Sequence, residues 1–173
     1  MMKILIVSDT HGRDEVLREV IGIEEPVDML IHLGDTVGSE KRIEQMLKVK
    51  TAFFTVKGNN DFSATLDERK EINIGKYKIL LVHGHRHGVY AGTQHLKDEA
   101  ISKDYDIVMY GHTHVPHYEN ENGIIILNPG SISYPRQRGN IGTYMVMNID
   151  PPDTPKIVLK FLDDEHTVID LLK

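Results

Sequence analysis

The sequence KILIVSDTHG, which runs from Lys3 to Gly12, joins a short apolar segment to a group of polar side chains. The apolar part, Lys3–Ser8, is nearly continuous, as expected for a strand that is buried on both faces of a sheet. Asp9 and His11 follow at once, and carboxylates and imidazoles are common metal ligands. The segment therefore predicts a buried strand that ends in candidate metal-binding side chains.

In the first third of the chain, further short apolar runs alternate with segments whose apolar residues have helical spacing. Apolar residues three and four positions apart indicate helices, and short apolar runs indicate strands. The expected elements after the first strand are a helix over Asp14–Ile21, a strand over Asp28–Leu33, a helix over Glu40–Val49 with Ser39 as its N-cap, and a strand over Ala52–Val56. Such alternation predicts parallel βαβ units with right-handed crossovers.

The second half is richer in strands. The expected elements are a hairpin over Lys70–Val82 turning near Gly75, a helix over Thr93–Lys103, a strand over Asp106–Tyr110, a hairpin of Val115–Glu119 and Gly123–Leu127, and strands over Gly142–Ile149 and Lys156–Leu162 on either side of the turn-rich DPPDTP. We therefore expect an α/β fold in which two mixed sheets pack face to face, with the helices outside. No repeat or long linker divides the chain, so we expect a single domain over residues 1–173.

Composition narrows the function classes. The 173 residues include no cysteine, which excludes disulfides and thiolate metal sites, and ten histidines. The formal charge is −6, so a long nucleic acid is not an expected partner. No apolar run approaches the roughly 20 residues of a membrane span, and no secretory leader is recognised. We expect a cytoplasmic protein that does not contact a membrane.

Metal-binding side chains follow five of the expected strands. The segments are Asp9-Thr10-His11, Gly34-Asp35, Gly58-Asn59-Asn60-Asp61, His83-Gly84-His85 and Gly111-His112-Thr113-His114. In open α/β sheets, ligands bind outside the carboxyl ends of the strands. In an extended D-x-H or H-x-H pair, both side chains point to one side. Each segment alone could be a cap, a turn, a loop or a structural histidine. The five together favour a metal site.

This order of segments resembles the signature of the calcineurin-like metallophosphoesterases, which is D-x-H, G-D, G-N, H and G-H-x-H. The short chain and the G-N-N-D variant resemble the small prokaryotic phosphodiesterase branch of that family. The resemblance extends from Asp9 to about Ser133. It implies a four-layer α-β-β-α sandwich, which agrees with the two sheets expected above. It also implies an enzyme, a metal-dependent phosphoric diester hydrolase.

The resemblance implies two divalent transition-metal ions per chain and assigns their ligands. The first ion would be held by Asp9, His11 and His114, the second by Asn59, His83 and His112, and Asp35 would bridge the two. A carboxylate has enough lone pairs to serve both ions. Four imidazoles, two carboxylates and one amide favour manganese, iron, nickel, cobalt or zinc over magnesium or calcium.

Charge indicates the substrate class. Two divalent ions, two aspartates and a bridging hydroxide leave one net positive charge, which a phosphodiester monoanion would neutralise. Ions about 3.5–4 Å apart would activate the hydroxide and polarise the phosphoryl oxygens. We therefore expect a small phosphodiester substrate, attacked in line with its leaving oxygen. The sequence does not identify the physiological substrate.

The chain departs from the family pattern at Asn60, where many relatives have a histidine that is thought to assist the leaving group. Asn60 can donate a hydrogen bond but cannot give up a proton. Asp61 is expected to remain free to orient an imidazole placed at that position. His85 is the candidate substitute for the missing histidine, although His85 and His87 are also consistent with exposed loop residues.

Other features leave alternatives open. The segment Asn128–Ser131 (NPGS) also resembles a family motif, and it is expected to support the metal-binding loops while forming a tight turn. Arg136 and Arg138 could meet a substrate phosphate or could be surface residues.

One retromer subunit shares this fold but acts as a protein-interaction scaffold, so a non-catalytic role is an alternative. A phosphomonoesterase is another, and a homo-oligomer remains open.

Overall fold

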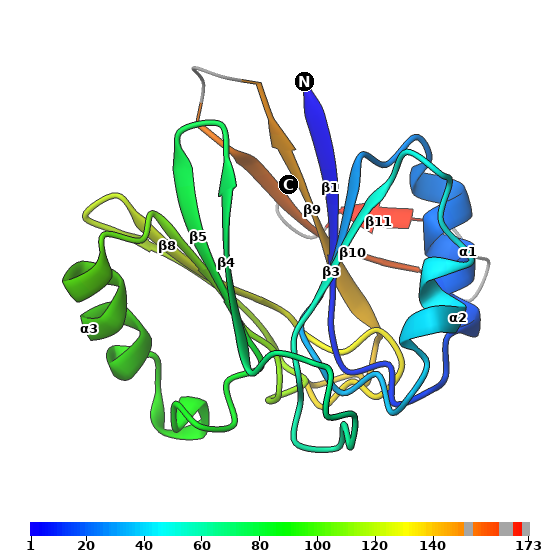
Figure 1. Ribbon diagram of the computed structural model, residues 1–173, viewed down its shortest axis with the longest axis horizontal. Helices are drawn as coiled ribbons and strands as arrows, with labels where there is room; N and C mark the ends of the chain where they lie inside the picture. The colour runs from blue at the N-terminus through cyan, green and yellow to red at the C-terminus, as the bar shows by residue number, and fades with distance from the viewer. Residues whose placement is uncertain (151–153, 163–167, 171–173) are drawn as a thin grey trace.

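The computed structural model describes residues 1–150, 154–162 and 168–170, the last three by their backbone alone. Two β-sheets, of six and five strands, pack face to face with helices on their outer surfaces (Figure 1). The expected four-layer α-β-β-α sandwich is confirmed. The middle of the DPPDTP turn, residues 151–153, lies outside the described residues. None of the helices in the described ranges is long and apolar enough to span a bilayer.

The six-stranded sheet has the order β11-β10-β9-β1-β2-β3. Its strands are β1 (Met2–Val7), β2 (Met29–His32), β3 (Ala52–Thr55), β9 (Thr143–Ile149), β10 (Lys156–Leu162) and β11 (Val168–Asp170), and its helices are α1 (Glu15–Glu24) and α2 (Glu40–Glu44). β1, β2 and β3 pair in parallel, as the alternation of strands and helices predicted. β9 is antiparallel to β1, which makes the sheet mixed. β11 was not predicted from the sequence.

The five-stranded sheet has the order β4-β5-β6-β8-β7. Its strands are β4 (Arg69–Ile74), β5 (Tyr77–Val82), β6 (Ile107–Met109), β7 (Pro116–Glu121) and β8 (Ile124–Pro129), and it carries α3 (Gln94–Lys103) and a short 3₁₀ helix, η1 (Val89–Ala91), that was not predicted. Both predicted hairpins are present. They turn at Gly75 and at Asn122–Gly123, where positive φ angles suit glycine and asparagine.

Apolar burial on both faces explains why β1 is a continuous apolar run. Ile4 and Ile6 pack between the two sheets, whereas Leu5 and Val7 pack beneath α1 and α2. A third cluster, which includes Leu96 of α3, covers the outer face of the five-stranded sheet. Full burial of each such side chain contributes about 1.5–3 kcal/mol to folding. The two sheets are therefore held firmly together.

The prediction that a helix extends to Val49 is wrong, because α2 ends at Glu44. The chain then makes tight turns, with the N–H of Met46 donating to the carbonyl of Ile43. Met46 and Leu47 still pack against the cluster beneath α2, so the apolar spacing reflects burial rather than a continuing helix. Ser39 holds the N-cap position, but its hydroxyl donates to Thr36 and Asp14 and does not cap the helix.

The carboxyl ends of β1, β2, β3, β5 and β6 lie at one edge of the sandwich. The loops that follow them gather there from both sheets, at the lower edge of Figure 1. These are the loops that contain the five polar segments. The fold therefore brings together side chains that are far apart in the sequence.

Candidate metal centre

The seven candidate ligands meet at this edge. His11 and His114 approach each other with their Nε2 atoms 3.2 Å apart, although 103 positions separate them in the chain. His83 Nε2 lies 3.1 Å from Asn59 Oδ1. The ring of His112 lies 5.1 Å from that of His83, measured between centroids. Two overlapping groups have the spacing needed to hold an ion, namely Asp9, His11 and His114, and Asp9, Asp35 and His83.

Asp9 has one satisfied and one unsatisfied oxygen. Its Oδ2 accepts hydrogen bonds from the Ser8 hydroxyl (2.5 Å) and from the His112 N–H (3.0 Å). Its Oδ1 is buried and has no hydrogen-bond partner among the described residues. That oxygen lies 3.9 Å from Nε2 of both His11 and His83 and 3.1 Å from Nε2 of His114. A buried carboxylate oxygen without a partner is costly, and a bound cation would satisfy it.

Two histidines are oriented by backbone carbonyls. His83 Nδ1 donates to the Leu33 carbonyl (2.7 Å), and His114 Nδ1 donates to the Tyr134 carbonyl (2.6 Å). Carbonyls only accept, so in the neutral rings the lone pair is on Nε2, which faces the centre. This arrangement is common for histidines that bind metals. The donor set therefore fits divalent ions.

Asp35 lies between the two groups of histidines. Its Oδ2 is 3.6 Å from His11 Nε2 and 3.5 Å from His83 Nε2. Asn60 orients the carboxylate, because its N–H donates to Oδ1 (2.7 Å) and its side-chain amide donates to Oδ2 (2.6 Å). The carboxylate therefore lies within reach of one histidine from each of the two groups.

At most of these groups, the pKa shift favours the protonation state that can bind a metal. Burial raises the pKa of Asp9, but His114 and His83 lower it more, so the net shift is downward. For Asp35, burial also raises the pKa, and His83 and Asn60 overcome it. Burial lowers the pKa values of His11 and His112, which favours their neutral form. The pKa of His83 is lowered by burial but raised further by Asp35 and Asp9, and the same carboxylates would attract a cation.

Five candidate ligands have left-handed backbone conformations. These are Asp9 (φ 57°), His11 (φ 48°), Asp35 (φ 57°), His112 (φ 69°) and His114 (φ 61°). The expectation that D-x-H and H-x-H are extended pairs is therefore wrong, although their side chains do converge. Positive φ is rare outside glycine, and such strain concentrates at functional sites. The surrounding packing holds these residues in conformations that they would otherwise avoid.

Two glycines allow the loops to approach closely. A Cβ atom on Gly58 would overlap the carboxylate and backbone N–H of Asp35, and one on Gly111 would overlap the Ser8 hydroxyl. The NPGS segment supports the same loops. Asn128 donates to the Gly111 carbonyl (2.8 Å), and Ser131 donates to the Asp9 carbonyl (2.8 Å). These contacts agree with the supporting role expected for that segment.

Asp61 does not have the free carboxylate that the sequence suggested. One oxygen accepts from the N–H groups of Asp35 and Gly58, each at 2.8 Å, and the other accepts from Val37 N–H (2.7 Å) and the Thr36 hydroxyl (3.0 Å). Asp61 is buried. The expectation that Asp61 could orient an imidazole at position 60 is therefore wrong, because its acceptor capacity is already used to shape the loop.

His85 lies beside the centre. Its ring is 5.4 Å from that of His83 and 6.1 Å from that of His112. Its Nε2 is 3.7 Å from Glu68 Oε2, and its Nδ1 is buried without a partner among the described residues. A pocket of about 240 Å³ opens here between Glu68, Arg69 and the segment 83–87. His87 lies farther along and pairs with Glu99 instead.

A second opening, the Arg136 cleft, lies on the other side of the centre. It has a volume of about 440 Å³ and is lined by His11, His114, Tyr134, Pro135 and Arg136. Arg136 therefore reaches the site, which is consistent with the alternative that it could meet a substrate phosphate. Arg138 is exposed and does not line the cleft. Tyr134 and Tyr90, which contact His11 and His112, were missed because nothing in their sequence context distinguishes them.

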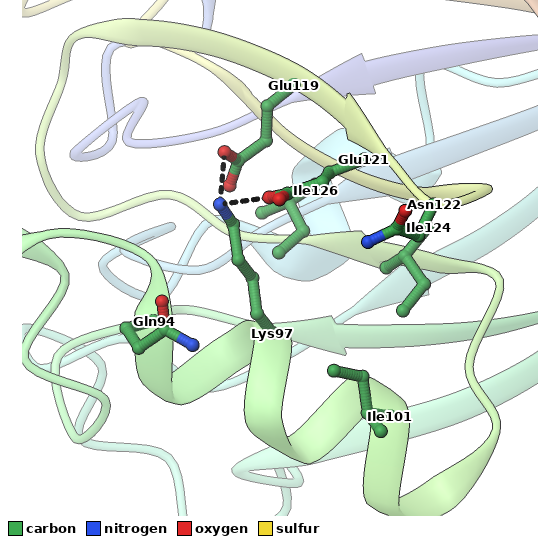
Figure 2. Close-up of a pocket in the computed structure, with 8 residues that line it drawn as sticks. All are labelled: Gln94, Lys97, Ile101, Glu119, Glu121, Asn122, Ile124 and Ile126. Carbon is green, nitrogen blue, oxygen red and sulfur yellow. Dashed lines mark hydrogen bonds and ion pairs between the residues drawn. The ribbon is translucent and has the colours of Figure 1, made fainter.

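A pocket between α3 and the β7–β8 hairpin is not the site. Figure 2 shows Lys97 reaching from α3 to the carboxylates of Glu119 and Glu121, each at 2.9 Å. The pocket has a volume of about 160 Å³, and none of its lining residues is a candidate ligand. Its only lining cation, Lys97, is paired with two carboxylates, so the pocket offers no free positive charge to a phosphate.

Comparison with known proteins agrees with this geometry. Residues 2–151 match the family model of the calcineurin-like phosphoesterase superfamily domain. The chain is 34% identical over 152 residues to a Mycoplasma pneumoniae protein named as a probable metallophosphoesterase, covering 86% of this chain and 91% of the relative. A Streptococcus pneumoniae structure described as a predicted phosphoesterase has a TM-score of 0.78 and 30% identity, covering 98% of this chain and 97% of its own.

The chain belongs to the calcineurin-like phosphoesterase superfamily. Within that class it is similar to the small metallophosphoesterases of prokaryotes. An archaeal phosphodiesterase structure is 27% identical, with a TM-score of 0.72, and the match covers 91% of this chain and 99% of that one. Vps29 of Entamoeba histolytica, in a zinc complex, has a TM-score of 0.76 and 23% identity, over 98% and 99% of the two chains, and this likeness concerns the fold alone.

Proposed function

We propose that this protein is a metal-dependent phosphodiesterase that uses two divalent transition-metal ions. The observation that supports this most strongly is the convergence of seven ligand-type side chains from five strand ends, among them Asp9, whose buried Oδ1 has no hydrogen-bond partner among the described residues. Asp9, His11 and His114 would hold one ion. Asn59, His83 and His112 would hold the other, and Asp35 would bridge them. The nitrogen-rich ligand set favours manganese, iron, nickel, cobalt or zinc.

The chemistry that two divalent ions supply in such a site is a bridging hydroxide as nucleophile and polarisation of the phosphoryl oxygens. The chain's own residues prepare the site for this chemistry. Asn60 fixes both oxygens of Asp35, and the carbonyls of Leu33 and Tyr134 fix the rings of His83 and His114. Because these groups are already oriented, little reorganisation is needed when substrate binds.

Three considerations favour a diester. One net positive charge on the filled site matches a monoanionic phosphodiester. The archaeal relative with 27% identity is described as a phosphodiesterase. The two openings beside the centre also provide room for a substituent on each side of the phosphorus, as a diester requires.

His85 is the candidate that would protonate the leaving oxygen. It lies next to His83 and His112, and Glu68 lies 3.7 Å from its Nε2. The side chain of Asn60 is instead engaged with Asp35. We therefore assign Asn60 to orienting the bridging carboxylate and His85 to the leaving-group side.

The test is a screen of metals against substrates. Chelated protein would be given manganese, iron, nickel, cobalt or zinc in turn and assayed with bis(p-nitrophenyl) phosphate, p-nitrophenyl phosphate and cyclic nucleotides. We expect metal-dependent hydrolysis in which the aryl diester exceeds the aryl monoester. Full activity in excess chelator would contradict the metal site. No hydrolysis with any metal would favour the protein-interaction scaffold, and a clear monoester preference would favour the phosphomonoesterase.

A further inference from the structure

Two arginines beside the Arg136 cleft have no carboxylate partner. Neither Arg13 nor Arg136 forms an ion pair with any residue that the structure describes, although the chain carries a net charge of −6. Other arginines are paired, such as Arg42 with Asp14 at 2.6 Å. Two uncompensated cations next to a candidate catalytic centre attract anions.

Arg136 is held in place at both ends. Its N–H donates to the His114 carbonyl (3.2 Å), and its Nη1 donates to the Tyr90 hydroxyl (2.7 Å). Tyr90 in turn donates to the His112 carbonyl (3.2 Å), and its ring lies 5.0 Å from that of His112. The guanidinium is therefore tied to the segment that contains two candidate ligands. Its position over the cleft is fixed before any substrate arrives, which lowers the entropy cost of binding.

Arg13 contacts the ring of Tyr134 rather than a candidate ligand. Its Cζ is 4.5 Å from the centroid of the Tyr134 ring, which meets the His11 ring edge-on at 5.2 Å. The Ser133 hydroxyl also donates to the Arg13 carbonyl (2.7 Å), which fixes the backbone. Because Arg13 contacts Tyr134 and no candidate ligand within the described residues, we place its guanidinium outside the group of side chains that would hold the ions. It would meet a different part of the substrate.

The pocket on the opposite side of the centre has a different charge balance. Arg86 pairs with Glu68 at 3.0 Å, and Arg69 pairs with Glu99 at 2.7 Å. The cations of that pocket are therefore already neutralised, and the pocket suits an uncharged group. The two sides of the centre differ in charge, so they would accept the two substituents of a diester unequally.

We propose that Arg13 and Arg136 bind a second anionic group of the substrate, on the side away from the leaving group. This rests on the proposed function and names its substrate class, which is phosphodiesters that also bear a terminal phosphate. The reacting diester neutralises the filled metal site, so the two guanidiniums are left for a further anion. Tyr90 is a positioning residue, since it holds Arg136 over the cleft.

Two matched probes test this. One is a nucleoside 5′-(p-nitrophenyl phosphate) with a free 3′-hydroxyl, and the other is the same ester with a 3′-phosphate. Both release p-nitrophenol from the same diester, so their leaving groups are identical. We expect the 3′-phosphate to lower KM about tenfold or more, as charge-assisted hydrogen bonds would, with little change in kcat.

Variants then assign the effect to residues. Arg13→Gln and Arg136→Gln should each remove most of the KM advantage of the 3′-phosphate, so the KM of the 3′-phosphate ester should rise much more than that of the 3′-hydroxyl ester. Arg136→Lys should retain part of the advantage. Tyr90→Phe keeps the ring against His112 but frees Arg136, so it should weaken the advantage without abolishing it. The control is Arg138→Gln, which removes an exposed cation from the same loop and should change neither KM.

Equal KM values for the two esters in the wild type would overturn the proposal, as would a loss that is the same for both esters in Arg136→Gln. A second measurement separates it from the proposed function. Calorimetric binding of a nucleoside 3′,5′-bisphosphate to chelated protein should be tighter than that of the 5′-monophosphate, and Arg136→Gln should remove the difference. If neither ester is hydrolysed, the proposed function is wrong. If the two nucleotides bind equally well, the assignment of the two arginines is wrong.

Discussion

Asn60 binds both oxygens of Asp35, through its backbone N–H at 2.7 Å and its side-chain amide at 2.6 Å. An asparagine that departs from the family pattern thus holds the carboxylate that lies between the two groups of histidines. Its backbone N–H and one side-chain N–H therefore point to Asp35 rather than to a substrate. The difference from relatives with histidine at this position is therefore not simply the loss of an acid.

Asn60→Ala should weaken metal binding and lower hydrolysis about 10–100-fold, because it releases a group that orients a ligand. Aryl and alkyl diesters should lose activity equally, since no proton transfer is involved. Metal titration by calorimetry and rates with both substrate types would measure this. Asn73→Ala, in an exposed position of β4, is the control. A loss confined to alkyl diesters would show that Asn60 acts on the leaving group instead.

Asp35→Ala should reduce hydrolysis by more than about 100-fold, the upper end for a residue that merely orients a ligand. The fold should survive, because the apolar clusters between and outside the sheets do not involve Asp35. Circular dichroism and activity assays would check both points. Asp98→Ala, on the exposed face of α3, should behave like the wild type. Retained activity in Asp35→Ala would place the chemistry elsewhere.

Gly58→Ala should lower both stability and activity, because the new methyl group would overlap Asp35. Overpacking of this kind costs about 1–3 kcal/mol. Gly22→Ala is the matched control, since that position in α1 has open space around it. It should raise stability by about 0.5–1 kcal/mol. Chemical denaturation of both variants would measure the two effects, and an active, stable Gly58→Ala would contradict the close approach of the two loops.

His32 makes stability depend on pH. Burial lowers its pKa from 6.5 to about 4, and the only hydrogen bond of its ring within the described residues is between Nε2 and the Thr10 hydroxyl (3.1 Å). Between these two pKa values the unfolded chain binds the proton and the folded chain does not. The free energy of unfolding therefore falls as pH falls through this range.

Between pH 7 and pH 5, this one group should cost the wild type about 2 kcal/mol of stability. His32→Gln should lose correspondingly less over the same range, since glutamine does not titrate. Urea denaturation at several pH values would compare the two, with the exposed His95→Gln as control. Parallel pH profiles for the wild type and His32→Gln would show that His32 does not remain neutral in the folded state.

Much of the fold was predictable because short apolar runs indicate buried strands. β1, β2 and β3 and both hairpins lie where the pattern placed them, within a few residues. α2 was predicted too long because Met46 and Leu47 have helical spacing, although they are buried from the turns that follow the helix. β11 was missed although its antiparallel partner β10 is its neighbour in the sequence, because a strand of three residues is too short to show a recognisable pattern.

The convergence of the candidate ligands was predictable from strand ends, but its backbone geometry was not. Positive φ at Asp9 and His114 arises from tertiary contacts, which no local propensity reports. Most hydrogen bonds of Asp61 could not be predicted either, because three of the four join it to a loop 24 to 26 positions away, such as the one from the Asp35 N–H. Arg13 carried a weak signal, since it follows the D-T-H-G segment directly.

The contact between His11 and His114 spans 103 positions, and Asp9 lies equally far from His112. During synthesis the chain emerges from its N-terminus, and the first strands appear long before the last histidines. A nascent chain that ends before β6 already has Asp9, Asp35 and His83, but it lacks His112 and His114, so neither proposed set of three ligands is complete. The full proposed ligand set therefore exists only after β6 and the loop that follows it have been made, so we expect a shorter ribosome-bound fragment to lack a complete dinuclear site.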